Sequence, residues 1–172
     1  MEKYKLWKVR TSGIIPESIV DGIGLRYVIF FQGCPHHCRG CQNPQTHSFS
    51  GGTFVDIRQI IKEIIYNPLL DGVTFSGGEP LCYYRQCGKI AEEVKKYNKT
   101  VWMYSGYTFE EIMNDYRNSI LENVDVLVDG KFILEQKDLD LRFRGSKNQR
   151  IIDVQSSLKA NKVILWSECN GY

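Results

Sequence analysis

The sequence predicts an α/β fold with a mostly parallel sheet, in the form of a partial, open β/α barrel. Three observations carry this prediction. Segments with strand character alternate with segments of helical periodicity, which is typical of a parallel sheet covered by helices. Cysteine- and glycine-rich motifs follow the predicted strands, as ligand-binding loops do in such sheets and barrels. The chain has 172 residues, whereas a complete eight-fold barrel usually needs about 250.

The first half of the chain begins this alternation. Residues 25–31 read as a strand that runs directly into a cysteine-rich loop. Apolar residues recur at helical spacing over 54–66, and Asn67-Pro68 ends this amphipathic helix. Residues 72–76 form a short buried strand. The core face of the next helix is marked by Ile90, Ala91, Val94 and Tyr97.

The second half continues the pattern. Residues 100–104 are the next predicted strand, and Thr108 with Glu111 forms a capping box at the start of a third helix. A strand over 124–128 ends at Asp129-Gly130. The inward residues of the third helix are Phe109, Ile112, Met113 and Tyr116. Two late strands are expected over 151–154 and 162–166.

Composition places the chain among ordinary globular proteins. Hydrophobic residues make up 42% and charged residues 24% of the sequence, and we expect one domain over residues 1–172. The net charge of +2 is too small to indicate binding to nucleic acid or to an anionic membrane. Residues 1–8 lack the apolar stretch of a signal peptide, and no run has the length of a membrane span. We therefore expect a cytoplasmic protein, in which thiols stay reduced.

Three cysteines form the most informative motif. Cys34, Cys38 and Cys41 follow the first predicted strand with the spacing C-x3-C-x2-C, so one short loop can surround a compact metal centre. Thiolates favour iron–sulfur clusters, zinc or copper(I). Three ligands leave one iron of a four-iron cluster open, and open positions are where metal chemistry occurs. A Cys3His zinc site with His36 or His37 as fourth ligand stays open on spacing alone.

The sequence indicates less about the roles of the other cysteines. Cys82 and Cys87 are five residues apart, and we expect both to pack as small apolar residues. Cys169 near the end of the chain has no functional assignment.

The strip Gly77-Gly78-Glu79-Pro80 follows a predicted strand. Two adjacent glycines let a backbone approach a ligand closely and leave its N–H and C=O groups unhindered. The carboxylate of Glu79 would suit a ligand ammonium group. An ordinary turn is the alternative, because glycine and proline are common turn residues.

Together, the three cysteines and this strip resemble the radical S-adenosylmethionine (SAM) superfamily. Residues 21–26, Asp-Gly-Ile-Gly-Leu-Arg, resemble the D-G-P-G-x-R motif of glycyl-radical-enzyme activases, with Ile23 in place of proline. Residues 43–47 also fit these activases, with His47 in place of a frequent tryptophan. Three further segments resemble the branch that activates anaerobic ribonucleoside-triphosphate reductase, namely residues 102–107, 126–132 and 143–150. The resemblance therefore spans about residues 20–153.

This resemblance implies a site of the radical SAM type inside a partial barrel of that type. Cys34, Cys38 and Cys41 would be the catalytic metal ligands of one [4Fe–4S] cluster, and SAM would chelate its open iron. The backbone of Gly78 and its neighbours would bind the methionine end of SAM. The implied cofactor contacts are Gly40, Cys41, Gln42, Gly77, Gly78, Glu79, Ser105 and Asp129.

The implied reaction is reductive cleavage of SAM to methionine and a 5′-deoxyadenosyl radical. That radical would take a hydrogen atom from a backbone glycine of anaerobic (class III) ribonucleoside-triphosphate reductase. Flavodoxin or ferredoxin is the expected electron donor. The basic residues Arg142, Arg144, Lys147 and Arg150 would form either a docking surface or a solvated face. Two alternatives remain: an activase of another glycyl radical enzyme, such as pyruvate formate-lyase, and a radical SAM enzyme acting on a small molecule.

Overall fold

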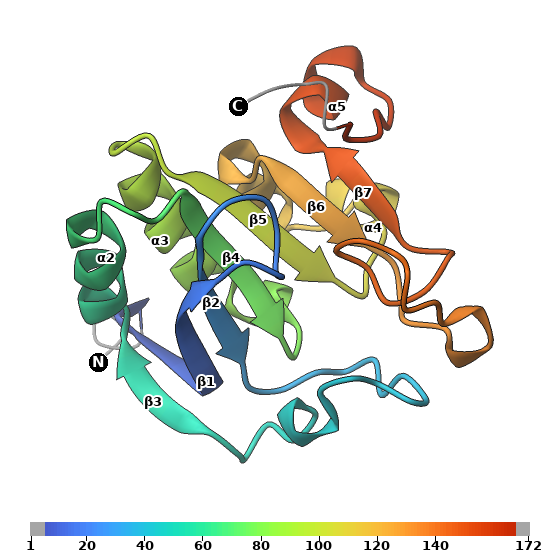
Figure 1. Ribbon diagram of the computed structural model, residues 1–172, viewed down its shortest axis with the longest axis horizontal. Helices are drawn as coiled ribbons and strands as arrows, with labels where there is room; N and C mark the ends of the chain where they lie inside the picture. Colours follow the sequence, from blue (N-terminus) through green and yellow to red (C-terminus); the bar gives the residue numbers. More distant parts are fainter. Residues whose placement is uncertain (1–5, 168–172) are drawn as a thin grey trace.

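The computed structural model describes residues 6–167, which form a layered α/β structure (Figure 1). Within these residues one sheet of seven strands has the order β3-β1-β2-β4-β5-β6-β7. The strands are β1 (Lys8–Ser18), β2 (Arg26–Phe31), β3 (Thr53–Asp56), β4 (Gly72–Gly77), β5 (Thr100–Ser105), β6 (Val126–Asp129) and β7 (Arg150–Asp153).

The centre of the sheet is parallel and its edges are antiparallel. β2, β4, β5 and β6 pair in parallel, whereas β1 pairs antiparallel with β2 and β3, and β7 antiparallel with β6. The sheet is open, with β3 and β7 at its two edges. The predicted α/β class is confirmed, and the radical SAM type of partial barrel stays a prediction. Because the central strands are parallel, their carboxyl ends all lie at the same end of the sheet.

Two helices cover one face of the sheet and form the main core with it. The helices of the fold are α2 (Ile57–Tyr66), α3 (Tyr84–Lys95), α4 (Phe109–Met113) and α5 (Val154–Ala160). Short 3-10 turns lie at Pro44–Thr46, Pro80–Tyr83, Asn118–Asn123 and Leu134–Gln136. The core joins α2 and α3 to the sheet through Ile57, Ile60, Ile64, Ile90, Ala91, Val94, Val73, Phe75, Val101 and Met103. In residues 6–167 each helix is too short or too polar to span a membrane.

Loops cover the opposite face. Side chains alternate across a strand, so Trp102 and Tyr104 of β5 face away from the helices that Val101 and Met103 contact. Trp102 packs there against Phe143 and Trp166, with ring centroids 5.3 and 5.5 Å apart. The connection between β1 and β2 crosses this face (Figure 1).

The predicted helix over 54–66 starts later than expected. Residues 53–56 pair with β1 as β3, and Asp56 caps α2 by accepting a 2.9 Å hydrogen bond from the Arg58 N–H. Phe54 therefore belongs to an edge strand. The expected inward positions of Tyr97 and Tyr116 were also wrong. Both lie beyond the ends of α3 and α4, and they are 53% and 78% exposed.

The other predicted elements are mostly confirmed. β2, β4 and β5 lie where the sequence predicts them, and the capping box is present between Thr108 and Glu111. The strand predicted over 124–128 starts at Val126. The strand predicted over 162–166 was wrong, because that segment contributes a single bridge from Leu165 to β7. β1 and β3 were not predicted.

Candidate metal centre

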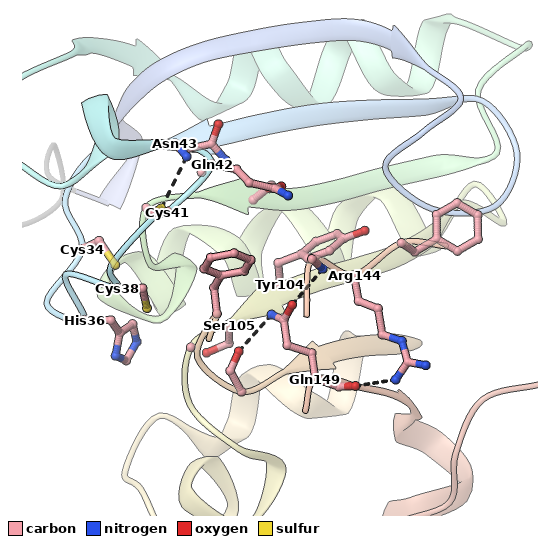
Figure 2. Close-up of a pocket in the computed structure, with 18 of the residues that line it drawn as sticks. Cys34, His36, Cys38, Cys41, Gln42, Asn43, Tyr104, Ser105, Arg144 and Gln149 are labelled. Carbon is pink, nitrogen blue, oxygen red and sulfur yellow. Dashed lines mark hydrogen bonds between the residues drawn. The ribbon is translucent and has the colours of Figure 1, made fainter. Parts of the chain in front are cut away.

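A cavity of about 360 Å³ opens at the carboxyl ends of the parallel strands (Figure 2). The loops that follow β2, β4, β5 and β6 all contribute to its wall, as the sequence predicts for the motif-bearing loops. The predicted site residues on this wall are Cys34, Cys38, Cys41, Gln42, Gly77, Gly78 and Ser105. The other three do not line the cavity: Glu79 and Asp129 are buried beside it, and Gly40 is exposed.

The cysteine loop, residues 34–41, presents its three sulfur atoms to this cavity from different depths. Cys34 is buried, whereas Cys38 and Cys41 are partly exposed. The Cys41 sulfur accepts a 3.4 Å hydrogen bond from the Asn43 N–H. Backbone N–H groups stabilise thiolate sulfur, so this hydrogen bond would favour a Cys41 thiolate.

Backbone hydrogen bonds tie the cysteine loop to the segment that follows it. Gly33 N–H donates to the Thr46 carbonyl at 2.7 Å, and Cys34 N–H donates to the His47 carbonyl at 3.1 Å. Gly40 adopts φ +72°, a left-handed conformation that favours glycine, and so turns the loop between Cys38 and Cys41. Gly40 thus shapes the loop, and its contact with a cofactor stays a prediction.

The three cysteine thiols are a donor set that suits an iron–sulfur cluster. Among residues 6–167, no three His, Cys, Asp or Glu side chains are already grouped around one ion position. The cysteine ligands of a [4Fe–4S] cluster bind separate irons, so their sulfur atoms need not converge. Burial raises the pKa of the Cys34 thiol, so metal binding at this residue would release a proton.

The glycine strip, residues 77–80, lies directly against the cysteine loop. The Gly78 N–H donates to the Phe31 carbonyl at 2.8 Å. A Cβ at Gly78 would lie 2.3 Å from the Gly33 carbonyl oxygen, so a larger residue would push the two loops apart. Gly77 has φ +89°, where a side chain would be strained. Glycine is therefore needed at both positions for packing, in addition to any ligand contact.

Glu79 is fully buried and bonded within the protein. Its Oε1 accepts from the Leu81 N–H at 3.1 Å and the Ser105 hydroxyl at 3.0 Å. Its Oε2 accepts from the Gly106 N–H at 2.9 Å and lies 2.7 Å from His36 Nε2. The predicted contact of Glu79 with a ligand ammonium group is untested and stays a prediction. His36, a candidate zinc ligand, is engaged by this carboxylate.

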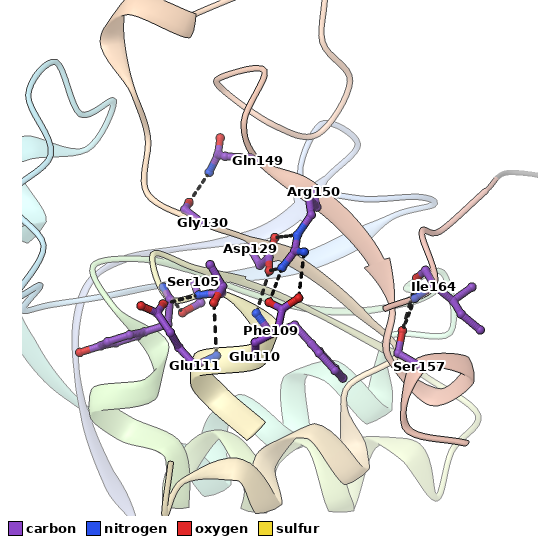
Figure 3. Close-up of polar contacts among 12 residues, drawn as sticks. Ser105, Phe109, Glu110, Glu111, Asp129, Gly130, Gln149, Arg150, Ser157 and Ile164 are labelled. Atoms are coloured by element: carbon purple, nitrogen blue, oxygen red, sulfur yellow. Dashed lines mark hydrogen bonds and ion pairs between the residues drawn. The ribbon is translucent and has the colours of Figure 1, made fainter. Parts of the chain in front are cut away.

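Asp129 joins three elements at the end of β6 (Figure 3). Its carboxylate accepts a 2.7 Å hydrogen bond from the Phe109 N–H at the start of α4. It also pairs with the Arg150 guanidinium of β7, which reaches Glu110 at 2.6 Å. Arg150 lowers the pKa of Glu110 by hydrogen bonding to it. Asp129 therefore holds α4 and β7 in place, and its contact with SAM or a cation stays a prediction.

The far wall of the cavity comes from the loop between β6 and β7. Gln149 organises this loop, since its side chain donates to the Gly130 carbonyl at 3.0 Å and accepts from the Gly145 N–H at 2.9 Å. Arg144 donates to the Gln149 carbonyl at 2.6 Å and lines the cavity (Figure 2).

The structure adds wall residues that were not predicted as site residues. Four polar examples are Asp21, Tyr104, Arg144 and Gln149. Each belongs to one of the segments that carry the family resemblance, which is the signal that would have found them. Burial, reinforced by the nearby Asp21 charge, raises the pKa of Tyr104 above its ordinary value, so this phenol stays neutral.

The remaining histidine and cysteines have varied surroundings. The ring of His47 meets that of His37 edge to face at 5.3 Å, and its Nε2 is buried without a hydrogen-bond partner among the described residues. Cys87 is buried in the core, which confirms its predicted packing, whereas Cys82 is exposed and that prediction was wrong. Cys169 lies outside the described residues.

Comparisons with known proteins agree with this geometry. The sequence matches the family described as "4Fe-4S single cluster domain" over residues 20–152. The anaerobic ribonucleoside-triphosphate reductase-activating protein of Haemophilus influenzae is 38% identical over 146 residues, covering 79% of this chain and 92% of its own. The proteins of the same name from Escherichia coli K12 and phage T4 are each 34% identical, covering 78% and 80% of this chain and 92% and 90% of their own.

A solved structure, that of QueE from Escherichia coli, shares 16% identity with a TM-score of 0.42, covering 59% of this chain and 54% of its own. That likeness is too low to support an argument. The identity to the reductase activators extends over most of both chains. The chain therefore belongs to the family of anaerobic ribonucleoside-triphosphate reductase-activating proteins.

Proposed function

We propose that this protein is an oxidoreductase of the radical SAM type that generates the glycyl radical of anaerobic (class III) ribonucleoside-triphosphate reductase. One observation carries the proposal: the three cysteines lie on the wall of a single cavity together with Gly77 and Gly78 of the glycine strip. A bound [4Fe–4S] cluster and SAM would supply one-electron cleavage of SAM to methionine and a 5′-deoxyadenosyl radical, which abstracts a hydrogen atom from a glycine. The names of the relatives support the choice of protein substrate.

In this proposal the cysteine loop holds the cluster. Cys34, Cys38 and Cys41 would each ligate one iron and leave the fourth for SAM. The Asn43 N–H already donates to the Cys41 sulfur and would keep that ligand oriented. Gly77, Gly78, Gln42 and Ser105 would contact SAM from the same wall. The cavity volume of about 360 Å³ is in the range of pockets for small molecules.

The loops over the sheet would keep water away from the reaction. Phe30 of β2 and three apolar residues of the β6–β7 loop, Phe132, Leu141 and Phe143, line the cavity. Excluding water strengthens polar contacts inside a site and limits side reactions. The protein would thus provide orientation and shielding, while the cofactor supplies the difficult chemistry.

The partners are proposed on the same basis. Anaerobic ribonucleoside-triphosphate reductase would present its glycine to the mouth of the cavity. A flavodoxin or ferredoxin would supply the electron, and the reaction would take place in the cytoplasm. No nucleic acid or membrane is required.

Electron paramagnetic resonance would test the proposal. The protein is reconstituted anaerobically with iron and sulfide, reduced, and mixed with SAM and the anaerobic reductase of the same organism. A glycyl-radical doublet that requires both SAM and this chain supports the proposal. A normal cluster signal with no radical on the reductase would direct the search to pyruvate formate-lyase or to a small molecule. Stoichiometric zinc and no cluster would contradict it.

A further inference from the structure

His36 and Glu79 join three loops of the site by one buried contact. His36 lies between Cys34 and Cys38 in the loop after β2, whereas Glu79 belongs to the glycine strip after β4. Their side chains are 6% and 0% exposed, and His36 Nε2 lies 2.7 Å from Glu79 Oε2. When Glu79 is a carboxylate it can only accept hydrogen bonds, and His36 Nε2 is then the donor of this contact.

The Glu79 carboxylate has no acceptor position to spare for a ligand. A carboxylate offers about four acceptor positions. Those of Glu79 are met by Leu81 N–H, Ser105 Oγ, Gly106 N–H and His36 Nε2. Glu79 also does not line the cavity that its neighbours Gly77 and Gly78 line. These contacts favour a supporting role for its side chain over direct contact with an ammonium group.

The His36 ring fills a slot in the loop after β5. A Cβ at Gly106 would lie 2.4 Å from the ring carbon Cδ2, so the ring packs directly on the glycine. The ring of Tyr107 meets that of His36 edge to face, with centroids 4.5 Å apart. The His36 side chain therefore connects the cysteine loop to the loops that follow β4 and β5.

We propose that His36 and Glu79 are a pair of positioning residues that hold the cysteine loop in its ligand-binding conformation before a cluster is present. The proposal rests on the proposed function only in taking the three cysteines as cluster ligands. Breaking the pair leaves the buried carboxylate short of a donor and frees the loop from β4 and β5. Local opening of the loop then becomes more frequent, without unfolding of the core.

Thiol alkylation of the cluster-free protein tests this directly. Iodoacetamide is added under anaerobic conditions, and mass spectrometry follows each cysteine with time. Cys34 is buried in the loop, and Cys87 is buried in the core. In His36→Leu we expect alkylation of Cys34 to accelerate at least about tenfold while Cys87 keeps its wild-type rate. A wild-type rate at Cys34 would overturn the proposal.

Two further variants keep the test decisive. His37→Asn is the matched control, because His37 has φ +48° and asparagine tolerates that conformation. It should leave Cys34 at its wild-type rate, and acceleration equal to that of His36→Leu would contradict a specific role for His36. If Cys87 is also alkylated faster in His36→Leu, the core has been disturbed, and His36→Gln, which retains a hydrogen-bond donor, replaces it as the test. A Cys34 alkylation rate near wild type in His36→Gln supports the proposal. A Cys34 rate as fast as in His36→Leu overturns it.

Cluster retention provides a second readout. After reconstitution, His36→Leu should lose iron to a chelator at least about tenfold faster than wild type and His37→Asn. Equal rates of loss would count against the proposal. If the wild-type protein forms no cluster, the proposed function fails, while the alkylation rates still decide whether this pair holds the loop.

Discussion

Replacing Arg150 tests how strongly its ion pairs at the carboxyl end of β6 stabilise the fold. Asp129 is 1% exposed, and its partner Arg150 is 33% exposed. In Arg150→Leu the carboxylate stays buried, with the Phe109 N–H still donating to it. Removing one partner of a fully buried pair costs about 3–5 kcal/mol. Because solvent reaches Arg150, we expect a smaller loss, about 2 kcal/mol in the free energy of unfolding.

Thermal unfolding of the cluster-free protein measures this loss. For a chain of this size, about 2 kcal/mol lowers Tm by about 4–8 °C. Glu110→Gln is the matched control, because it removes only the partner that is 56% exposed. Its Tm should change by less than about 2 °C. Adding Asp129→Asn to Arg150→Leu should restore part of the loss, since a neutral amide is easier to bury. Equal Tm values for Arg150→Leu and Glu110→Gln would refute the reasoning.

Three other changes have defined outcomes. Cys34→Ala should abolish cluster assembly, measured as bound iron and sulfide, and a full cluster would remove Cys34 from the ligand set. Gly78→Ala should weaken both SAM binding and cluster retention, because its Cβ would lie 2.3 Å from the Gly33 carbonyl oxygen; equilibrium dialysis at wild-type affinity would contradict this. Hydrogen bonds from Arg58 lower the pKa of Asp56 from 3.8 to about 2, so this carboxylate stabilises the fold above pH 3.8 and loses its effect as pH falls toward 2. The Tm advantage over Asp56→Asn should shrink across that range, and a constant difference would contradict the assignment.

The sequence predicts the parallel centre of the sheet well for a physical reason. β4 and β5 are covered on both faces, so they appear as short apolar runs that local propensity identifies. The Thr108 capping box is equally local. In contrast, β1 contains Gly13 and Pro16 and mixes polar with apolar residues, and its place depends on pairing with β2 and β3. The position of such an antiparallel strand is fixed by tertiary contacts that no local pattern contains.

The candidate site likewise combines local features, which the sequence predicts, with contacts between distant segments, which it does not. The spacing of the three cysteines could predict candidate ligands, because it is a local property of one loop. The surroundings of Glu79 depend on loops that follow three different strands, so the sequence alone did not predict its contact with His36. The roles of Gln149 and Arg144 likewise appear only after the chain folds back over the sheet.

The cavity walls are contributed by opposite ends of the described chain, with Cys34 on one side and Gln149 on the other. During synthesis the cysteine loop emerges long before β6 and β7, whose connecting loop closes the far wall. Until then its thiols lack their enclosure and are open to oxidation or to adventitious metals. The enclosed cavity therefore exists only after β7 has paired with β6, so completion of the sheet also completes the site.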